Sequence, residues 1–205
     1  IGDKAFCTGG DQSEDSHEGS YGGRGTTGMP VEDLHTIIRD IPKPVIARVN
    51  GYAIGGGHVL HILCDLTIAS DNAIFGQVGP GMGSVDPGYG TAYMARLVGE
   101  KKAREIWYLC RRYSAQEAMD MGLVNKVVTP DNLDAALRAM TDTLIDKSAV
   151  TLAMGKVAFY EQLEKGVVDA YAHTGEVMAR NMMTADAAEG IQAFIDKRTP
   201  VWTGT

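Results

Sequence analysis

Two glycine-centred loops constrain the fold of this chain more than any other feature of its sequence. The first spans residues 5–12 (AFCTGGDQ), and the second spans residues 50–58 (NGYAIGGGH). Each follows a predicted strand, and the second also begins a predicted helix. Glycine lets a backbone approach a ligand closely, and the first turn of a helix carries N–H groups without intrahelical partners. Two such loops aimed at one point predict an oxyanion hole, in which N–H donors stabilise negative charge on an oxygen.

Two other functions of glycine-rich loops are disfavoured by the residues around them. The chain has no strand followed by the G-x-G-x-x-G pattern and downstream acid of a dinucleotide-binding turn. It also lacks the Lys-Ser/Thr pair that completes a nucleotide-binding P-loop. A run of three glycines is equally compatible with a tight turn or a packing site, so the loops have to be interpreted together with the rest of the chain.

Size and charge limit the remaining possibilities. The 205 residues are 44% hydrophobic and carry a formal net charge of −7, which predicts one domain, or one domain with a small appendage, around a substantial core. The acidic balance argues against a nucleic-acid partner, because phosphate binding needs a basic surface. No apolar run is long enough for a membrane span, and no signal peptide is recognisable, so we expect a cytoplasmic protein without a membrane partner.

Neither the cysteines nor the paired histidines predict a metal site. Cys7, Cys64 and Cys110 are odd in number and show no C-x-x-C spacing, which argues against disulfides and zinc. His58 and His61 lie three positions apart on a predicted helix, but two ligands without a neighbouring acid do not complete a zinc set. We therefore expect no metal and no redox cofactor.

Short strands alternating with helices predict an α/β core, followed by a helical C-terminal region. We expect a core domain over residues 1–130 and a helical region over 131–205. The predicted strands cover residues 44–49, 66–69, 73–76 and 123–128. The predicted helices lie near residues 30–39, 57–63, 91–98, 100–111, 114–121, 130–146, 148–165, 166–182 and 184–196. Glycine-rich polar segments predict loops at residues 13–30 and 77–90. Because the first glycine loop begins so near residue 1, we expect that part of the fold precedes this sequence.

The chain resembles the crotonase (enoyl-CoA hydratase/isomerase) superfamily over essentially its whole length, and five segments carry the resemblance. They are residues 5–12, 43–65, 75–90, 101–107 and 115–128. The resemblance implies a spiral of β-β-α units, a helical C-terminal trimerisation region, and trimers or hexamers. It also implies an acyl-CoA substrate whose thioester oxygen accepts hydrogen bonds from the backbone N–H groups of Gly10 and Gly56.

Two positions depart from the hydratases of this superfamily. Those enzymes carry two glutamates that handle water, and the corresponding positions here are Val59 and Gly79. Neither residue can act as an acid or a base. Simple enoyl-CoA hydration is therefore disfavoured.

Residues 75–80 (FGQVGP) and 83–86 (GSVD) resemble two other groups of the superfamily more closely. One group, the dihydroxynaphthoyl-CoA synthases, closes a ring by a Dieckmann-type condensation. The other, 2-ketocyclohexanecarboxyl-CoA hydrolase, opens a ring, and residues 21–36 and 84–90 look more like this hydrolase. In synthases with glycine at position 79, a bicarbonate ion replaces the missing glutamate, and Gln77, Gly79 and Trp107 match that anion pocket.

The resemblance also implies roles for individual loop residues. Asp86 is expected to transfer protons, and Ser84 to hydrogen-bond a ring carbonyl. Residues expected to contact the substrate or CoA are Cys7, Gly9, Asp11, Gln12, Tyr21, Arg24, Tyr52, Ile54, Gly55 and Tyr89. Lys197 and Arg198 either meet the CoA phosphates or form a solvated basic pair. Met182 stands where both groups place a substrate-facing tyrosine.

These residues predict hydrolytic C–C cleavage of a cyclic β-keto acyl-CoA, a reaction of aromatic-compound degradation. Three alternatives stay open. The chain could close a ring as a naphthoyl-CoA synthase, catalyse another reaction of the hydratase/isomerase family, or bind CoA without catalysis.

Overall fold

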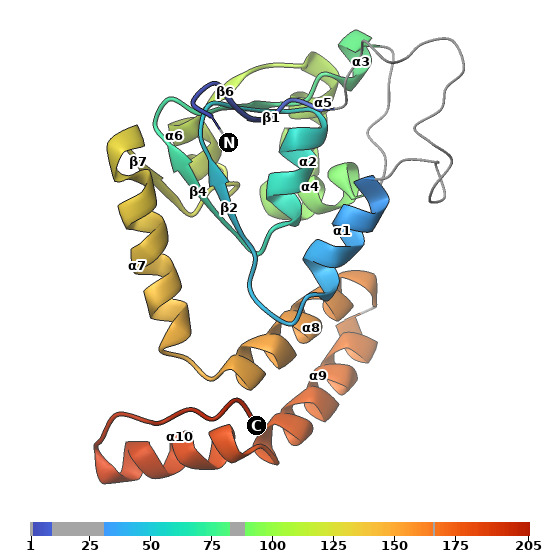
Figure 1. Cartoon of the computed structure of the whole chain (residues 1–205). Helices are drawn as coiled ribbons and strands as arrows, with labels where there is room; N and C mark the ends of the chain where they lie inside the picture. The colour runs from blue at the N-terminus through green and yellow to red at the C-terminus, as the bar shows by residue number, and fades with distance from the viewer. Residues whose placement is uncertain (1, 10–30, 83–88, 166) are drawn as a thin grey trace. The chain divides into compact units, whose positions relative to one another are not determined.

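The computed structural model describes residues 2–9, 31–82, 89–165 and 167–205, without the side chains of residues 167–173 (Figure 1). The chain divides into two units. The first consists of Ile1–Arg39 and Val45–Leu137, and the second of Asp40–Pro44 and Arg138–Thr205.

The first unit is built on two small sheets. One contains the strands β1 (Ala5–Cys7), β3 (Tyr52–Ile54), β5 (Ile74–Gly76) and β6 (Tyr113–Ser114), in the order β1-β3-β5-β6. Its first three strands are parallel, and β6 is antiparallel to β5. The other sheet is parallel and contains β2 (Ile46–Val49), β4 (Leu66–Ser70) and β7 (Lys126–Val128), in the order β2-β4-β7. From β2 to β5, consecutive strands alternate between the two sheets, which produces a spiral.

The turn between β2 and β3 depends on a glycine. Gly51 has φ = +72°, and a Cβ atom there would lie 2.2 Å from the carbonyl oxygen of Lys4. Only glycine combines this conformation with so close an approach. The strands on either side are deeply buried, with Val49 and Ala53 both 0% exposed. The turn therefore fixes how the chain crosses from one sheet to the other.

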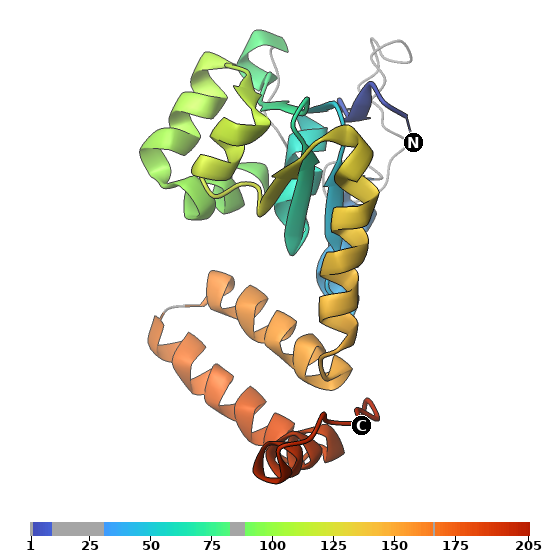
Figure 2. The same cartoon turned by 90° about the vertical axis from the view of Figure 1, so that its left-hand side faces the viewer.

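Helices cover these sheets. They are α1 (Val31–Asp40), α2 (Gly56–Leu63), α3 (Gly79–Met82), α4 (Gly90–Val98), α5 (Glu100–Leu109), α6 (Ala115–Asp120), the 3₁₀ turn η1 (Pro130–Asn132) and α7 (Leu133–Ile145). Figure 2 shows α4 and α5 together on one side of strands β2 and β4. Helix α6 begins with a reciprocal cap, because the Ser114 hydroxyl accepts from the Glu117 N–H while the Glu117 carboxylate accepts from the Ser114 N–H.

The second unit contains the part of α7 from Arg138 onward, α8 (Ala149–Glu164), α9 (Val167–Met182), α10 (Ala185–Asp196) and a C-terminal tail. The tail is bound by Asp186, which is 1% exposed. Its carboxylate accepts hydrogen bonds from the hydroxyl of Ser148 at 2.7 Å, the N–H of Thr203 at 2.7 Å and the N–H of Gly204 at 3.1 Å. These bonds lower the pKa of Asp186, with the Ser148 bond as the largest cause.

Two further contacts attach the same tail. Glu189 binds the Arg198 guanidinium through two bonds of 2.6 and 2.9 Å, which lower the pKa of Glu189 to about 2. The Trp202 indole donates to the carbonyl oxygen of Asp146 at 2.7 Å. Arg198, considered above as a candidate CoA contact, is thus engaged by an acid of its own unit.

The structure confirms the predicted α/β class and corrects three details of the predicted elements. The loops predicted at residues 5–12 and 50–58 contain strands β1 and β3, and the loop predicted at 77–90 contains helix α3. Strand β6 was not predicted. Elements of two to four residues are too short to show a periodic pattern, and the Gly-Pro-Gly-Met sequence of α3 has a loop-like composition.

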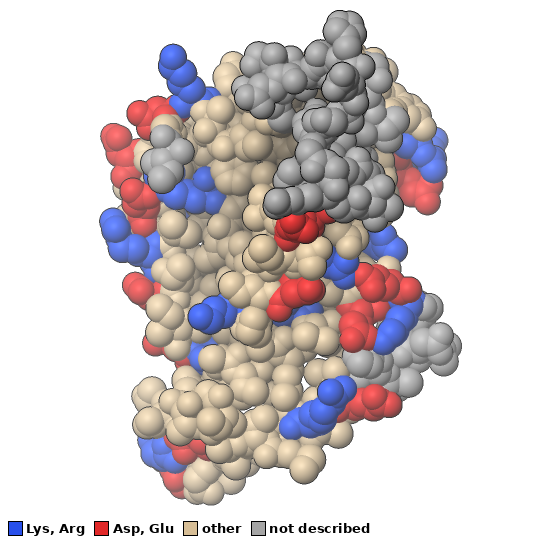
Figure 3. Space-filling model, turned by 45° about the vertical axis from the view of Figure 1, so that its right-hand side comes forward, with Lys and Arg blue, Asp and Glu red and all other residues tan. Residues whose placement is uncertain are grey.

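On the face drawn in Figure 3, acidic and basic side chains are interspersed.

Candidate functional site

The two glycine loops meet at one end of the four-stranded sheet. Strands β1 and β3 are parallel neighbours, so the segments that follow them leave the same edge. A Cβ atom built on Gly56 would lie 3.4 Å from the Cα atom of Gly9, and one built on Gly9 would lie 3.8 Å from the backbone nitrogen of Gly56. The backbone of the first loop therefore directly faces the first turn of α2.

Helix α2 begins at this meeting point, and its first N–H groups have no acceptor within the helix. Its N-cap residue, Gly55, has φ = 56° and ψ = −120° and accepts the first helical bond from Val59 at 3.0 Å. The N–H groups of residues 56–58 consequently lie outside the helical ladder. Strand β1 packs closely on this turn, since a Cβ atom on Gly57 would lie 1.9 Å from the carbonyl oxygen of Cys7. The Gly56 N–H is thus available for a ligand oxygen, as an oxyanion hole requires.

The structure brings part of the predicted site together. Cys7, Gly9, Gly55 and Gly56 gather where β1 ends and α2 begins. Ile54 ends strand β3 beside them, whereas Tyr52 lies at the opposite end of that strand and is 50% exposed. Seven predicted residues lie outside the described parts of the chain. They are Gly10, Asp11, Gln12, Tyr21, Arg24, Ser84 and Asp86.

Gln77 has an unusual environment. It follows β5, its side chain is 0% exposed, and neither its Oε1 nor its Nε2 atom has a hydrogen-bond partner among the described residues. A buried polar group without a partner typically costs about 1–3 kcal/mol. The buried Nε1 atom of Trp107 is likewise without a partner in the described part of the chain. Such atoms call for a bound ion, a water molecule or a ligand.

Gly79 and Trp107 lie on helices that pack against each other. Gly79 is buried and begins α3, while Trp107 lies on α5. The two helices are in contact, and a Cβ atom on Gly81 would lie 3.9 Å from the Sγ atom of Cys110, just beyond α5. The residues matched to an anion pocket therefore come from neighbouring elements and contribute three unpartnered polar atoms.

His58 and His61 form a buried hydrogen-bonded pair on α2. The Nε2 atom of His61 lies 3.1 Å from the Nδ1 atom of His58, and the rings pack against Phe75. Burial lowers the pKa of His58 to about 4, and burial together with the neighbouring His58 holds the pKa of His61 well below its usual value of 6.5. No group of side chains suited to a metal ion occurs among the described residues, so this pair is best described as neutral core histidines.

Tyr89 links two helices. The Arg39 guanidinium, on α1, donates to the Tyr89 hydroxyl and also lies 4.7 Å above the tyrosine ring. His35 of α1 packs edge-on against Tyr89, and Tyr93 of α4 stacks on it at 5.1 Å. Sequence reasoning did not identify His35 and Arg39 as its neighbours. Their spacing of four residues, which places both on one face of α1, was the available signal.

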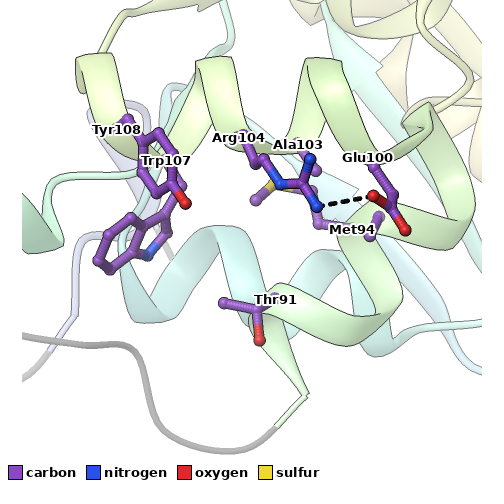
Figure 4. Close-up of a pocket in the computed structure, with 8 residues that line it drawn as sticks. Thr91, Met94, Glu100, Ala103, Arg104, Trp107 and Tyr108 are labelled. Carbon is purple, nitrogen blue, oxygen red and sulfur yellow. Dashed lines mark hydrogen bonds and ion pairs between the residues drawn. The ribbon is translucent and has the colours of Figure 1, made fainter.

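A pocket of about 380 Å³ lies between α4 and α5 (Figure 4). Its lining residues are Thr91, Met94, Ala95, Glu100, Ala103, Arg104, Trp107 and Tyr108. Arg104 and Glu100 of α5 form an ion pair at 2.6 Å. The aromatic side chains of Trp107 and Tyr108 lie further along the same helix. The volume suits a small ligand. Trp107 is the one predicted site residue in the lining, which contains no residue of the two glycine loops.

Comparison with known proteins identifies the family. The family described as enoyl-CoA hydratase/isomerase matches residues 2–205. The chain belongs to this family. The crystal structure of an enoyl-CoA hydratase from Mycobacterium smegmatis has a TM-score of 0.89 and 39% sequence identity, covering 97% of this chain and 77% of that chain. An enoyl-CoA hydratase from Bacillus anthracis gives 0.88 and 30%, covering 100% and 79% respectively.

A human relative extends the comparison. The structure of enoyl Coenzyme A hydratase domain-containing protein 3 has a TM-score of 0.76 and 36% identity, covering 83% of this chain and 67% of that chain. These matches confirm the crotonase fold and the predicted superfamily resemblance. Members of the enoyl-CoA hydratase/isomerase family bind acyl-CoA substrates, which gives the juxtaposed glycine loops a chemical context.

Two buried positions near this site, Val59 on α2 and Gly79 at the start of α3, carry no acidic side chain. Val59 is 1% exposed and Gly79 is buried, and neither residue type carries a carboxylate.

No helix among the described residues has the length and apolar character needed to cross a membrane.

Proposed function

We propose that this family member opens the ring of a cyclic β-keto acyl-CoA by hydrolysis. The observation that supports it most is the approach of Gly9 to Gly56, because two donors can reach one ligand oxygen only if the two loops lie this close together. Val59 and Gly79 argue against hydration by paired glutamates, because a side-chain acid and base are missing there. A reaction that depends mainly on stabilising an enolate fits these residues better.

The proposed reaction has one water molecule as its second substrate. Water adds to the ring ketone, and the bond from that carbon to the α-carbon breaks. The electron pair moves into the thioester, whose oxygen accepts hydrogen bonds from the N–H groups of Gly10 and Gly56. Protonation of the α-carbon then gives an open-chain acyl-CoA with a new carboxylate. One donor of this kind typically lowers the barrier by about 3–4 kcal/mol. Asp86 is proposed to transfer the protons, and Ser84 to bind the ring ketone oxygen.

We further propose that Gln77, Gly79 and Trp107 bind bicarbonate. The three unpartnered atoms, Oε1 and Nε2 of Gln77 and Nε1 of Trp107, suit a small anion with hydrogen-bonding oxygens. When bound, bicarbonate would supply the proton acceptor that a glutamate supplies in hydratases. The amide and indole groups would bind and orient it, and the buried position would exclude bulk water.

The second unit is proposed to support trimers or hexamers. It leaves many large apolar side chains exposed, including Phe159 (70%), Met183 (87%) and Phe194 (85%). Exposed apolar surface of this extent marks interaction sites. Sedimentation of the purified chain tests the proposal. A mass three or six times that of the chain is expected, and a monomer at all concentrations would contradict it.

Product analysis tests the reaction. The purified chain is incubated with 2-ketocyclohexanecarboxyl-CoA, with and without bicarbonate, and in parallel with crotonyl-CoA. Mass spectrometry is expected to detect the addition of one water and formation of pimeloyl-CoA, while crotonyl-CoA stays unchanged. Turnover of crotonyl-CoA alone would instead identify an ordinary hydratase.

The second candidate is ring closure by a naphthoyl-CoA synthase. The same Gln77, Gly79 and Trp107 arrangement favours it, since the resemblance to those synthases first suggested the anion site. The test uses the open-chain aryl keto acyl-CoA precursor of the naphthoyl ring. Loss of one water from this precursor, with no reaction of the cyclic substrate, would establish condensation in place of hydrolysis.

A further inference from the structure

A buried chain of hydrogen bonds determines which nitrogen of His58 carries its proton. The Thr67 hydroxyl donates to the carbonyl oxygen of His61 at 3.3 Å, so it accepts from the Nδ1–H of His61 at 3.4 Å. A neutral His61 then has a bare Nε2 atom, which accepts from the Nδ1–H of His58 at 3.1 Å. A neutral His58 is left with a bare Nε2 atom, a hydrogen-bond acceptor.

Both rings are held neutral by their surroundings. His58 is 1% exposed and His61 is 0% exposed. Burial lowers the pKa of His58 to about 4, so its ring carries one proton at neutral pH. The Nε2 atom of His58 has no partner among the described residues.

This acceptor lies in the same region as Gln77. His58 belongs to the first turn of α2, and its ring packs edge-on against Phe75 at 6.3 Å. The N–H of Gly55 donates to the carbonyl oxygen of Gly76 at 3.0 Å. Residues 75–77 therefore run beside the first turn of α2, and both buried side chains in this region, His58 and Gln77, carry polar atoms without partners.

The unpartnered atoms of this region differ in whether they donate or accept hydrogen bonds, and this difference bears on which anions can bind. The unpartnered Nε2 of Gln77 and Nε1 of Trp107 are donors, which any small anion can use, whereas Gln77 Oε1 is an acceptor, as His58 Nε2 is. His58 Nε2 is an acceptor and needs an O–H or N–H. We propose that His58 Nε2 accepts the O–H of bicarbonate, so that the buried site prefers bicarbonate to anions without a proton. The proposal rests on the anion site proposed above and is independent of which ring reaction the protein catalyses.

The test needs neither substrate nor turnover. The full chain is prepared with nitrogen-labelled histidine, and the ring nitrogens are followed by NMR at a pH where both histidines are neutral. We expect an unprotonated His58 Nε2 whose signal shifts with bicarbonate but not with nitrate. A protonated Nε2 in the free protein, or a signal unmoved by saturating bicarbonate, would overturn the proposal.

Two variants examine selectivity by calorimetry. His58→Leu removes the acceptor and is expected to weaken bicarbonate binding about tenfold or more, while nitrate binding is retained. Thr67→Val releases the constraint on the His61 tautomer and is expected to weaken bicarbonate binding less. An equal loss of both anions in His58→Leu would argue for a purely structural role. The NMR experiment on the unaltered chain decides the matter if that variant does not fold, and product analysis judges the ring reaction separately.

Discussion

The Cα atom of Gly9 lies 3.4 Å from the point that a Cβ atom on Gly56 would occupy. This distance leaves the backbones of two loops in contact with no side chain between them. A substitution at either glycine would thus place a methyl group where the thioester oxygen is expected to bind.

The glycines that begin α2 should respond differently to alanine. A Cβ atom on Gly56 meets its neighbour at an ordinary contact distance, so Gly56→Ala is expected to fold. Its backbone N–H is retained, but the added methyl group is expected to crowd the thioester oxygen away from that donor, with a loss of about 100- to 1000-fold in kcat. A Cβ atom on Gly57 would lie 1.9 Å from the Cys7 carbonyl oxygen, so Gly57→Ala should be destabilised by about 3 kcal/mol or more. Thermal unfolding and steady-state kinetics measure the two effects.

Gly155 provides the matched control for these substitutions. It lies inside α8, and nothing is within 4 Å of its potential Cβ position. Gly155→Ala should raise stability by about 0.5–1 kcal/mol. Equal stability of the Gly56 and Gly57 variants would contradict the packing described here.

Gln77→Leu should abolish bicarbonate binding without lowering the stability of the ligand-free chain. The substitution removes two buried polar atoms without partners, so the ligand-free variant is expected to be at least as stable as the unaltered chain. Bicarbonate should raise the melting temperature of the unaltered chain and leave that of the variant unchanged. Titration of both proteins by differential scanning fluorimetry measures this. A bicarbonate-dependent shift that survives in the variant would remove Gln77 from the anion site.

The buried histidines should make the protein sensitive to mild acid. The pKa of His58 is lowered from 6.5 to about 4 by burial, so the neutral ring favours the folded state. This contribution is fully present above pH 6.5 and is lost as the pH falls toward 4, a change of about 3 kcal/mol for His58 alone. Denaturant unfolding over this range should show the loss, and His58→Leu should flatten the profile. A parallel profile for the variant would assign the acid sensitivity to other groups.

Asp186→Asn should release the C-terminal tail. The carboxylate accepts from two backbone N–H groups and two hydroxyls, and an amide replaces one acceptor oxygen with a donor. Hydrogen exchange at Thr203 and Gly204 is expected to accelerate. Because the pKa of Asp186 lies below 3.8, the unaltered chain should keep this protection above that value and lose it only at lower pH. Unchanged exchange at Thr203 would show that other contacts hold the tail.

Local sequence patterns were sufficient for much of the fold. The helical spacing at 185–196 and the glycine turns before α2 are encoded within a few neighbouring residues, so they could be predicted. The meeting of the two glycine loops was also predicted, from their shared composition and their places after predicted strands, although it is the long-range pairing of β1 with β3 that brings them to one edge. The two-residue strand β6, Tyr113–Ser114, depends on pairing with β5 and left no local pattern.

Features that depend on distant partners could not be predicted. Nothing near Gln77 in the sequence indicates that its amide is buried without a partner. Similarly, Arg198 appeared able to contact a phosphate, but Glu189, nine positions earlier, engages its guanidinium. The connection of Arg39 to Tyr89 spans 50 positions. Such long-range pairings follow from the assembled fold and not from spacing.

The position of Asp186 also bears on the order in which the chain can be completed during synthesis. Ser148 emerges from the ribosome 38 residues ahead of this carboxylate, whereas Thr203 and Gly204 follow it by 17 and 18 residues. Helix α10 can therefore form while the Asp186 carboxylate still accepts most of its hydrogen bonds from water. The helical unit reaches its final set of hydrogen bonds only after residues 203 and 204 have left the exit tunnel.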